Sequence, residues 1–265
     1  MTAVRPPAGP PRVLAIHSHP DDLELQCGGT LCRLADLGCE IVLATLTSGD
    51  LGSGEKSREE IAAIRHAEAQ RSADLLGATY DCLGLGDLTI VHDDPTRRLV
   101  TAAVRRAKPD LILTAPPVDY MCDHETTSRL VRDAAFAASV PLYRCPAEGE
   151  PEPPMEGVPY LYYCDPVGQA TPLGEPWRPG IVVDVTSQIE RKLELLACHV
   201  SQREWLRRQH GIGEYLAVAR RWTAARGEMI GVEFGEGFRQ HLGHPHPTDD
   251  LLAKLLSAVR PAESV

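Results

Sequence analysis

Short apolar segments alternate with helix-like segments along most of the 265-residue chain. Short apolar runs predict strands, and apolar residues spaced three and four apart predict helices. The predicted strands are 12–17, 40–47, 79–85, 110–117, 161–165 and 180–186, and the predicted helices are one that opens at Cys27–Thr30, then 58–77, 96–109, 124–140 and 187–208. This alternation predicts the α/β class, with a mostly parallel sheet and helices on both faces.

The composition changes in the second half of the chain, where ten of the 22 prolines lie between residues 141 and 179. A proline-rich stretch of this length is typical of a loop that covers a site. We therefore predict one domain over residues 1–265, with a flexible arm at 1–11 and a covering segment at 141–179.

The net charge of −10 disfavours partners that are themselves anionic. An acidic protein repels phosphate backbones and anionic lipids, so we expect no nucleic acid and no membrane surface as a partner. The chain has no apolar run near the roughly 20 residues of a membrane-spanning helix, and its first residues lack the apolar core of a signal peptide. Its eight cysteines show no C-x-x-C spacing, so we expect reduced thiols and a cytoplasmic location.

Histidines and acids crowd together at the end of the first predicted strand. The segment HSHPDDLE places two histidines and three carboxylates within residues 17–24. Neighbouring carboxylates repel one another, and a bound cation would offset that repulsion. Open α/β sheets bind ligands beyond the carboxyl ends of their strands, which is where this segment lies.

A second cluster, DYMCDH (119–124), follows the fourth predicted strand. Two clusters after parallel strands can face each other across one crevice. His19, Asp22 and His124 would offer two imidazoles and one carboxylate, a ligand set that suits catalytic zinc and also iron(II). Asp21 would then be the base that takes a proton from water. The alternative is that both clusters merely cap the helices that follow them.

These motifs resemble the PIG-L/LmbE-like zinc-dependent N-deacetylases. HPDDLE (19–24) and the following CGGTL (27–31) are similar to the A-H-P-D-D-x-E signature of that family, and the Asp-His pair at 123–124 is similar to its later H-P-D-H element. The segments IRHAEAQRSADLLG, VDVTSQIERKLELLACHVSQ and GEGFRQHLG also resemble family segments. The resemblance therefore covers nearly the whole chain outside the proline-rich stretch.

The resemblance implies a Rossmann-like, LmbE-like fold and zinc-dependent hydrolysis of an N-acyl group, often on a sugar of the N-acetylglucosamine type. By position it implies His19, Asp22 and His124 as zinc ligands and Asp21 as the general base. Fe²⁺, Mn²⁺ or Co²⁺ would suit the same ligands. The family also leads us to expect a homo-oligomer, either a trimer or a hexamer.

The chain departs from the family pattern at Met121 and Cys122. Many members carry at the first of these positions a histidine associated with oxyanion stabilisation, whereas methionine donates no hydrogen bond. Some relatives receive a C-terminal histidine from a neighbouring subunit. Of His241, His244 and His246, we favour the first two for that role, and the alternative is a histidine tail without a catalytic function.

Other polar side chains are candidates for the surroundings of the site. Asp50 either touches sugar hydroxyls or ends a turn, with the turn favoured. Arg65 and Glu68 either pair on the helix surface or face the crevice. Asp119 either orients the ring of the ligating histidine or caps its loop. We interpret His17 as a packing residue near the site rather than a ligand.

The predicted function is removal of an N-acetyl or other N-acyl group from a small-molecule amino sugar or amino-sugar conjugate. One alternative is an amidase that acts on a larger sugar-thiol or antibiotic conjugate. Another is a non-catalytic binding or scaffold protein on the same fold, which the intact His19, Asp21 and Asp22 disfavour. The glycine-rich loop at 48–57 lacks a phosphate-binding fingerprint, which argues against a nucleotide-binding protein.

Overall fold

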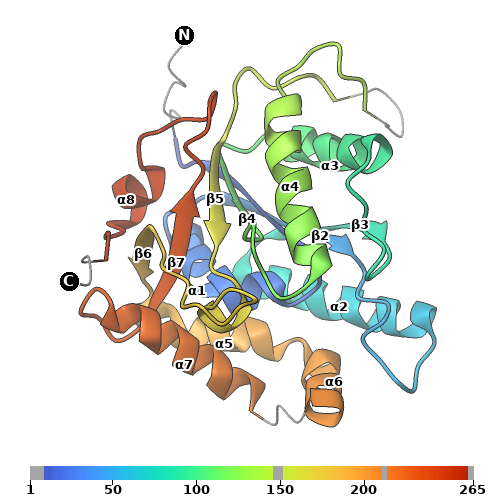
Figure 1. Cartoon of the computed structure of the whole chain (residues 1–265), viewed down its shortest axis with the longest axis vertical. Coiled ribbons are helices and arrows are strands. Elements are labelled where there is room, and N and C mark those ends of the chain that lie inside the picture. Colours follow the sequence, from blue (N-terminus) through green and yellow to red (C-terminus); the bar gives the residue numbers. More distant parts are fainter. Residues whose placement is uncertain (1–8, 146–151, 211–213, 262–265) are drawn as a thin grey trace.

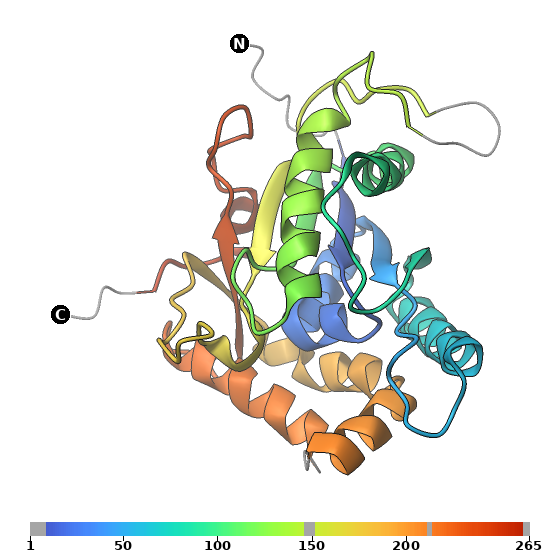
Figure 2. The same ribbon diagram turned by 45° about the vertical axis from the view of Figure 1, so that its right-hand side comes forward.

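The computed structural model describes residues 9–145, 152–210 and 214–261, which form a seven-stranded sheet in the order β3-β2-β1-β4-β5-β7-β6. Helices cover both faces of the sheet (Figures 1 and 2). The strands are β1 (Arg12–His17), β2 (Glu40–Thr47), β3 (Thr79–Leu85), β4 (Leu111–Thr114), β5 (Tyr160–Cys164), β6 (Ile181–Asp184) and β7 (Gly235–Gln240). The helices are α1 (Asp22–Asp36), α2 (Arg58–Leu76), α3 (Asp94–Ala107), α4 (Cys122–Ala137), α5 (Ile189–Ala197), α6 (Val200–His210), α7 (Tyr215–Glu228) and α8 (Leu251–Leu256).

Strands β1 to β5 are parallel, and β7 runs antiparallel to both of its neighbours, β5 and β6. The predicted α/β class with a mostly parallel sheet is confirmed. In the described part of the chain, no helix is both long and apolar enough to span a membrane. All eight cysteines are free thiols.

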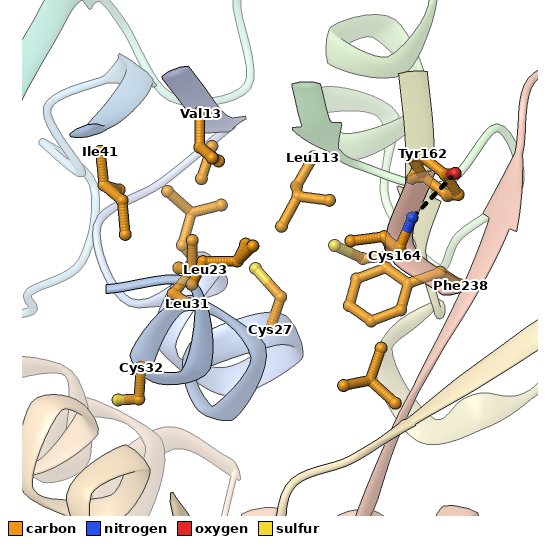
Figure 3. Packing of buried hydrophobic residues seen from close by; sticks show 14 of the residues in the cluster. Val13, Leu23, Cys27, Leu31, Cys32, Ile41, Leu113, Tyr162, Cys164 and Phe238 are labelled. Carbon is orange, nitrogen blue, oxygen red and sulfur yellow. Dashed lines mark hydrogen bonds between the residues drawn. The ribbon is translucent and has the colours of Figure 1, made fainter. Parts of the chain in front are cut away.

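The core has two halves because successive strand residues point to opposite faces. Val13 and Ala15 of β1 pack with α1, α2, α5 and α8, whereas Leu14 and Ile16 pack with α3 and α4. Figure 3 shows the first half, in which Leu23 and Leu31 of α1 lie under the sheet. Both faces of β1 are therefore buried, as its continuous apolar sequence predicts.

The order of the strands reverses between β1 and β4. The chain leaves β1 for α1 on one face of the sheet and leaves β4 for α4 on the other face. The carboxyl ends of these two strands, with the first turns of α1 and α4, therefore flank the position at which open α/β sheets bind ligands.

Helix α1 begins at Asp22 rather than at Cys27, so our prediction of its start was wrong. The backbone at Cys27 is non-helical, with φ −139° and ψ 15°, and the sequence pattern marked this interruption as a helix start. Because the interruption breaks the helical hydrogen bonds, the N–H groups of Gly29 and Thr30 donate instead to the carboxylate of Glu236 in β7, at 2.9 and 2.7 Å. The ammonium group of Lys192 lies 2.6 Å from the same carboxylate.

The prediction of one long helix over 187–208 was also wrong, because the helical backbone is interrupted between α5 and α6. The buried His199 lies at this interruption, and its Nε2 is 3.1 Å from Glu24 Oε1 in α1.

The proline-rich stretch 141–179 contains β5, and only part of it lies near the crevice. The main-chain N–H of Val167 reaches Asp119 there, whereas Tyr143 packs on α3. Most of the predicted arm at 1–11 lies outside the described residues.

Candidate metal and catalytic site

The turn between β1 and α1 directs two adjacent carboxylates to different partners. Asp21 adopts a left-handed conformation with φ 99°, which is uncommon and strained for a residue with a side chain. Its side chain makes no capping hydrogen bond with α1. Helix capping therefore does not explain Asp21, and the two side chains take part in separate clusters.

The carboxylate of Asp22 lies among three imidazoles. Its Oδ2 atom is 2.7 Å from His17 Nδ1, 3.2 Å from His19 Nδ1 and 3.4 Å from His124 Nε2. All four side chains are buried. Ligand atoms of His17, Asp22 and His124 lie within 4.8 Å of one another and form a group that could hold a metal ion. Because the buried Nε2 of His124 makes no hydrogen bond, its lone pair is available to a metal, and the donor set fits one.

Two of the three imidazoles are oriented by carboxylates on their other nitrogen. Asp119 Oδ2 lies 2.7 Å from His124 Nδ1, and Asp123 Oδ2 lies 3.1 Å from His19 Nε2. This is the usual environment of a metal-ligating histidine.

His17 has a different environment from the other two histidines. Its Nε2 lies 3.1 Å from the amide oxygen of Gln26, and its Nδ1 accepts the N–H of Ser18 at 2.8 Å. The structure thus places the predicted ligands His19, Asp22 and His124 near one another, but the group that could hold a metal ion contains His17, which we had interpreted as a packing residue, in place of His19.

Two of the three imidazoles favour positive charge, whereas burial lowers the pKa of His17. Burial opposes the charge of His19, but hydrogen bonds with Asp123 and Asp22 outweigh it and raise the pKa to about 9. Burial likewise opposes the charge of His124, and the carboxylates of Asp22 and Asp119 raise its pKa to about 10. An excess of carboxylate around these rings attracts either protons or a metal ion.

The Asp21 carboxylate is held from two sides. Arg65 Nη2 lies 3.1 Å from Oδ1, and the hydroxyl of Tyr215 donates a 2.6 Å hydrogen bond to Oδ2. Burial raises the pKa of Asp21 to about 6, against the opposing effect of Arg65. A carboxylate with a pKa near neutral pH is suited to accept and return a proton.

Arg65 reaches Asp21 through the glycine-rich loop 48–57. A Cβ atom at Gly49 would lie 2.5 Å from the guanidinium group, and one at Gly52 would lie 2.8 Å from it. The glycines therefore make room for this side chain. Glu68 does not pair with Arg65, because it accepts hydrogen bonds from the N–H and the hydroxyl of Ser201, at 2.9 and 2.6 Å, where α6 begins.

The three remaining candidates from the sequence, Asp50, Met121 and Asp119, have different surroundings. Asp50 accepts the N–H of Asp87 at 2.8 Å and pairs with Arg58, which is the role of a turn residue. Met121 is the residue before α4. Asp119 accepts the main-chain N–H of Tyr120 in its own loop and that of Val167 after β5, and it also orients His124, so it has both of the roles that we considered.

The C-terminal histidines lie away from the crevice. The N–H of His241 donates to the carbonyl of Leu161 near the start of β5, whereas the crevice lies at the carboxyl ends of the parallel strands. Figure 1 shows the chain after β7 at the opposite end of the sheet from the start of α4. His241 and His244 therefore do not reach the metal cluster of their own chain, and a role for them across a subunit contact stays a prediction.

Tyr215 and His199 contact the site, and the sequence did not predict either of them. They come from α7 and from the break before α6, and each contacts the segment 17–24 only through the fold. Tyr215 belongs to no local motif, whereas His199 lies within the family-like segment VDVTSQIERKLELLACHVSQ, which did not single out this side chain.

The fold and the site define an α/β protein with a buried cluster at the carboxyl ends of β1 and β4 that could hold a metal ion. A model of the PIG-L family, described as GlcNAc-PI de-N-acetylase, matches residues 14–135. The matched part of the chain carries the whole metal cluster.

Two curated relatives differ in their named activities. The diacetylchitobiose deacetylase of Thermococcus kodakarensis is 29% identical over 198 residues, which are 72% of this chain and 70% of that protein. The 4-oxalmesaconate hydratase of Pseudomonas putida is 25% identical over 197 residues, 71% of this chain and 73% of that protein. The structure of N,N'-diacetylchitobiose deacetylase from Pyrococcus horikoshii superposes with a TM-score of 0.71 and 27% identity, covering 90% of this chain and 88% of that one.

Proposed function

We propose that the protein is a zinc-dependent hydrolase that removes an N-acetyl or other N-acyl group from an amino sugar or amino-sugar conjugate. The observation that carries this proposal is the Asp22 cluster with the free Nε2 of His124, placed beside a separately held carboxylate, Asp21. The similarity to the deacetylase from Thermococcus kodakarensis supports the same chemistry.

We assign His19, Asp22 and His124 as the metal ligands, with His17 close enough to join them. Bound zinc would polarise the amide carbonyl and lower the pKa of a water molecule towards about 7. Asp21 would take the proton of that water and return it to the leaving amine. Arg65 and Tyr215 position Asp21 for both transfers.

Met121 offers no hydrogen bond to a developing oxyanion. We propose a homo-oligomer in which His241 or His244 of a neighbouring copy serves this purpose, because neither reaches the crevice of its own chain. Separate alanine substitutions at the two positions should each be assayed for turnover. Unchanged turnover in both would refute this role and leave the oxyanion to the metal. We also propose a cytoplasmic location, since the eight thiols are free.

The proposal is tested by amine release from N-acetylglucosamine and diacetylchitobiose. Metal-stripped protein is assayed with and without added zinc, beside the Asp21→Asn variant, which keeps the size of the side chain but is not a base. We expect release that depends on zinc and is absent in the variant.

The hydratase relative makes hydration the second candidate. About one tightly bound metal per chain without any amine release, together with hydration of 4-oxalmesaconate, would favour that activity. A chain that binds no metal would refute both candidates.

A further inference from the structure

Tyr120 lies beside His124 at an exposed edge of the metal cluster. Its ring is edge-on to the imidazole of His124, with the ring centroids 5.4 Å apart and the ring planes at 83°. Tyr120 is 64% exposed, whereas His17, Asp22 and His124 are buried. Tyr120 therefore both contacts a member of the cluster and faces solvent.

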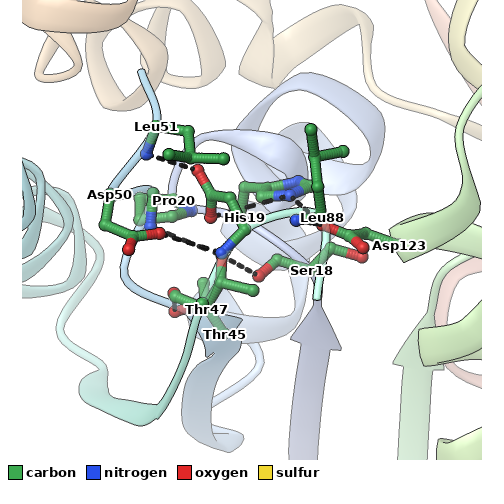
Figure 4. Close-up of polar contacts among 12 residues, drawn as sticks. Ser18, His19, Pro20, Thr45, Thr47, Asp50, Leu51, Leu88 and Asp123 are labelled. Atoms are coloured by element: carbon green, nitrogen blue, oxygen red, sulfur yellow. Dashed lines mark hydrogen bonds and ion pairs between the residues drawn. The ribbon is translucent and has the colours of Figure 1, made fainter. Parts of the chain in front are cut away.

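The edge of the cluster at His19 is different, because the protein itself occupies it. Asp123 Oδ2 lies 3.1 Å from His19 Nε2, and the main-chain N–H of Leu88 donates to the same oxygen at 2.7 Å (Figure 4). Asp123 is fully buried. The nitrogen on this edge already has its partner, so a substrate atom has no free group to bind there.

The backbone of Tyr120 is held by the carboxylate that also orients His124. The N–H of Tyr120 donates to Asp119 Oδ1 at 2.7 Å, and Asp119 Oδ2 lies 2.7 Å from His124 Nδ1. One buried side chain therefore fixes Tyr120 and His124 relative to each other. A hydrogen-bond donor stabilises a transition state most effectively when it is fixed in this way before charge develops.

The hydroxyl of Tyr120 has no hydrogen-bond partner among the described residues. Burial of this end of the side chain raises the pKa of Tyr120, and so do the carboxylates of Asp22, Asp21 and Asp119. Asp22 has a larger effect than Asp119, although Asp119 is the neighbour of Tyr120 in the sequence. Because such effects fall with distance, the hydroxyl points towards the metal cluster and Asp21. It stays protonated at neutral pH and is free to donate a hydrogen bond.

We propose that the hydroxyl of Tyr120 donates a hydrogen bond to the carbonyl oxygen of the scissile amide and so supplies a donor that Met121 lacks. This inference rests on the proposed N-deacylase function. When water adds to the amide carbon, the π electrons of the carbonyl move to its oxygen, which becomes negative. Tyr120 keeps its proton, and no covalent bond to it forms or breaks. The oxygen has lone pairs for more than one donor, so Tyr120 does not exclude a histidine of a neighbouring copy.

The test compares a tetrahedral analogue with the product amine. Glucosamine N-methylphosphonamidate carries a negatively charged oxygen at the position of the oxyanion, whereas glucosamine has no atom there. The dissociation constants of both compounds are measured calorimetrically on zinc-loaded protein. We expect Tyr120→Phe to weaken binding of the analogue by about 10- to 100-fold, the usual contribution of a hydrogen bond to a charged group, and to leave binding of glucosamine unchanged.

Tyr143→Phe is the matched control, because it removes a phenolic hydroxyl that contacts Asp94 and Arg97 at α3, away from the crevice. It should bind the analogue as tightly as the wild type. Zinc affinity and thermal unfolding are measured for each variant and distinguish a donor from a structural support of His124. A loss of zinc affinity in Tyr120→Phe that accounts for the loss of analogue affinity would overturn the inference. Unchanged affinity of Tyr120→Phe for the analogue would overturn it as well.

Turnover separates a failure of this inference from a failure of the proposed function. Amine release from N-acetylglucosamine that is as fast in Tyr120→Phe as in the wild type would support the function and overturn the inference. Analogue binding that depends on Tyr120, without amine release from any N-acyl amino sugar, would refute the function and support Tyr120 as a donor to a tetrahedral oxyanion. Failure of the zinc-loaded wild type to bind the analogue would overturn the inference.

Discussion

Replacing either carboxylate that orients a ligating histidine should weaken metal binding, and the two positions should differ. Both oxygens of Asp119 accept hydrogen bonds from donors: Oδ1 from the N–H groups of Tyr120 and Val167, and Oδ2 from His124 Nδ1. An asparagine at 119 must point its NH₂ group at one of these donors in either orientation. It therefore either loses the hydrogen bonds from Tyr120 and Val167 or forces the proton of His124 from Nδ1 to Nε2. In the second case Nε2 has no lone pair left for a metal.

Asp123 is a matched contrast. Its Oδ2 accepts both the N–H of Leu88 and His19 Nε2, and the partner of Oδ1 is the weakly polar thiol of Cys122 at 3.7 Å. An asparagine at 123 can keep its oxygen on the two donors and turn its NH₂ group towards the sulfur. This variant loses the negative charge but keeps the hydrogen bonds.

The loss of an outer-shell carboxylate typically reduces metal affinity by about 10- to 100-fold, or roughly 1.4 to 2.7 kcal/mol. We expect Asp119→Asn at the upper end of this range and Asp123→Asn at or below the lower end. Zinc affinity is measured by competition with a chromophoric chelator at pH 7.5, and circular dichroism checks the fold. Zinc affinity of Asp119→Asn within threefold of the wild-type value would refute the reasoning, as would a larger loss in Asp123→Asn.

Three further results are expected. Tyr215→Phe should lower kcat by about tenfold with unchanged zinc affinity, because it frees one oxygen of Asp21 without touching a ligand; a parallel loss of zinc would contradict this role. Gly49→Ala should destabilise the protein by about 1 to 3 kcal/mol and reduce turnover, because its Cβ would meet the guanidinium group of Arg65 at a residue with φ +73°; an active variant as stable as the wild type would show that the loop adjusts. Burial lowers the pKa of His246 to about 4, below about 6.5 in an unfolded chain, so the unfolded state binds more protons between these values and stability should fall as the pH drops from about 6.5 to about 4. The free energy of unfolding is measured with urea at pH 4.5 and 7.5. His246→Gln should make the difference between these two values smaller by about 1 to 2 kcal/mol, and an unaltered difference would refute the lowered pKa of His246.

The strands in the first half of the fold could be predicted because each is determined by residues that are adjacent in the sequence. The strands 12–17 and 40–47 match β1 and β2 in both bounds, since each is a continuous apolar run that ends at a polar residue. Strand β7 was missed because its sequence GEGFRQ shows neither alternation nor an apolar run. It is a strand because its backbone fits between β5 and β6 and its Glu236 has partners in α1 and α5.

Two local motifs and one rule of topology predicted that Asp22 and His124 lie close together, but not that His17 completes the group that could hold a metal ion. The segments 17–24 and 119–124 follow β1 and β4, and the reversal of strand order places them together. What the sequence could not show is which residues hold Asp21. The hydroxyl of Tyr215 comes from 194 residues away, and contacts of that kind depend on the finished fold.

The carboxylate of Glu236 gives the site a dependence on the order in which the chain is made. By the time residue 135 has been synthesised, the nascent chain carries every metal ligand, yet the open N–H groups of Gly29 and Thr30 in α1 have no acceptor. That acceptor is in β7, close to the end of the chain, and it also neutralises the buried Lys192. A ribosome-bound fragment, or a product truncated before β7, would have all the metal ligands but no anchor for the helix that carries Asp22. Anchoring of this helix therefore requires β7, which is synthesised after every metal ligand.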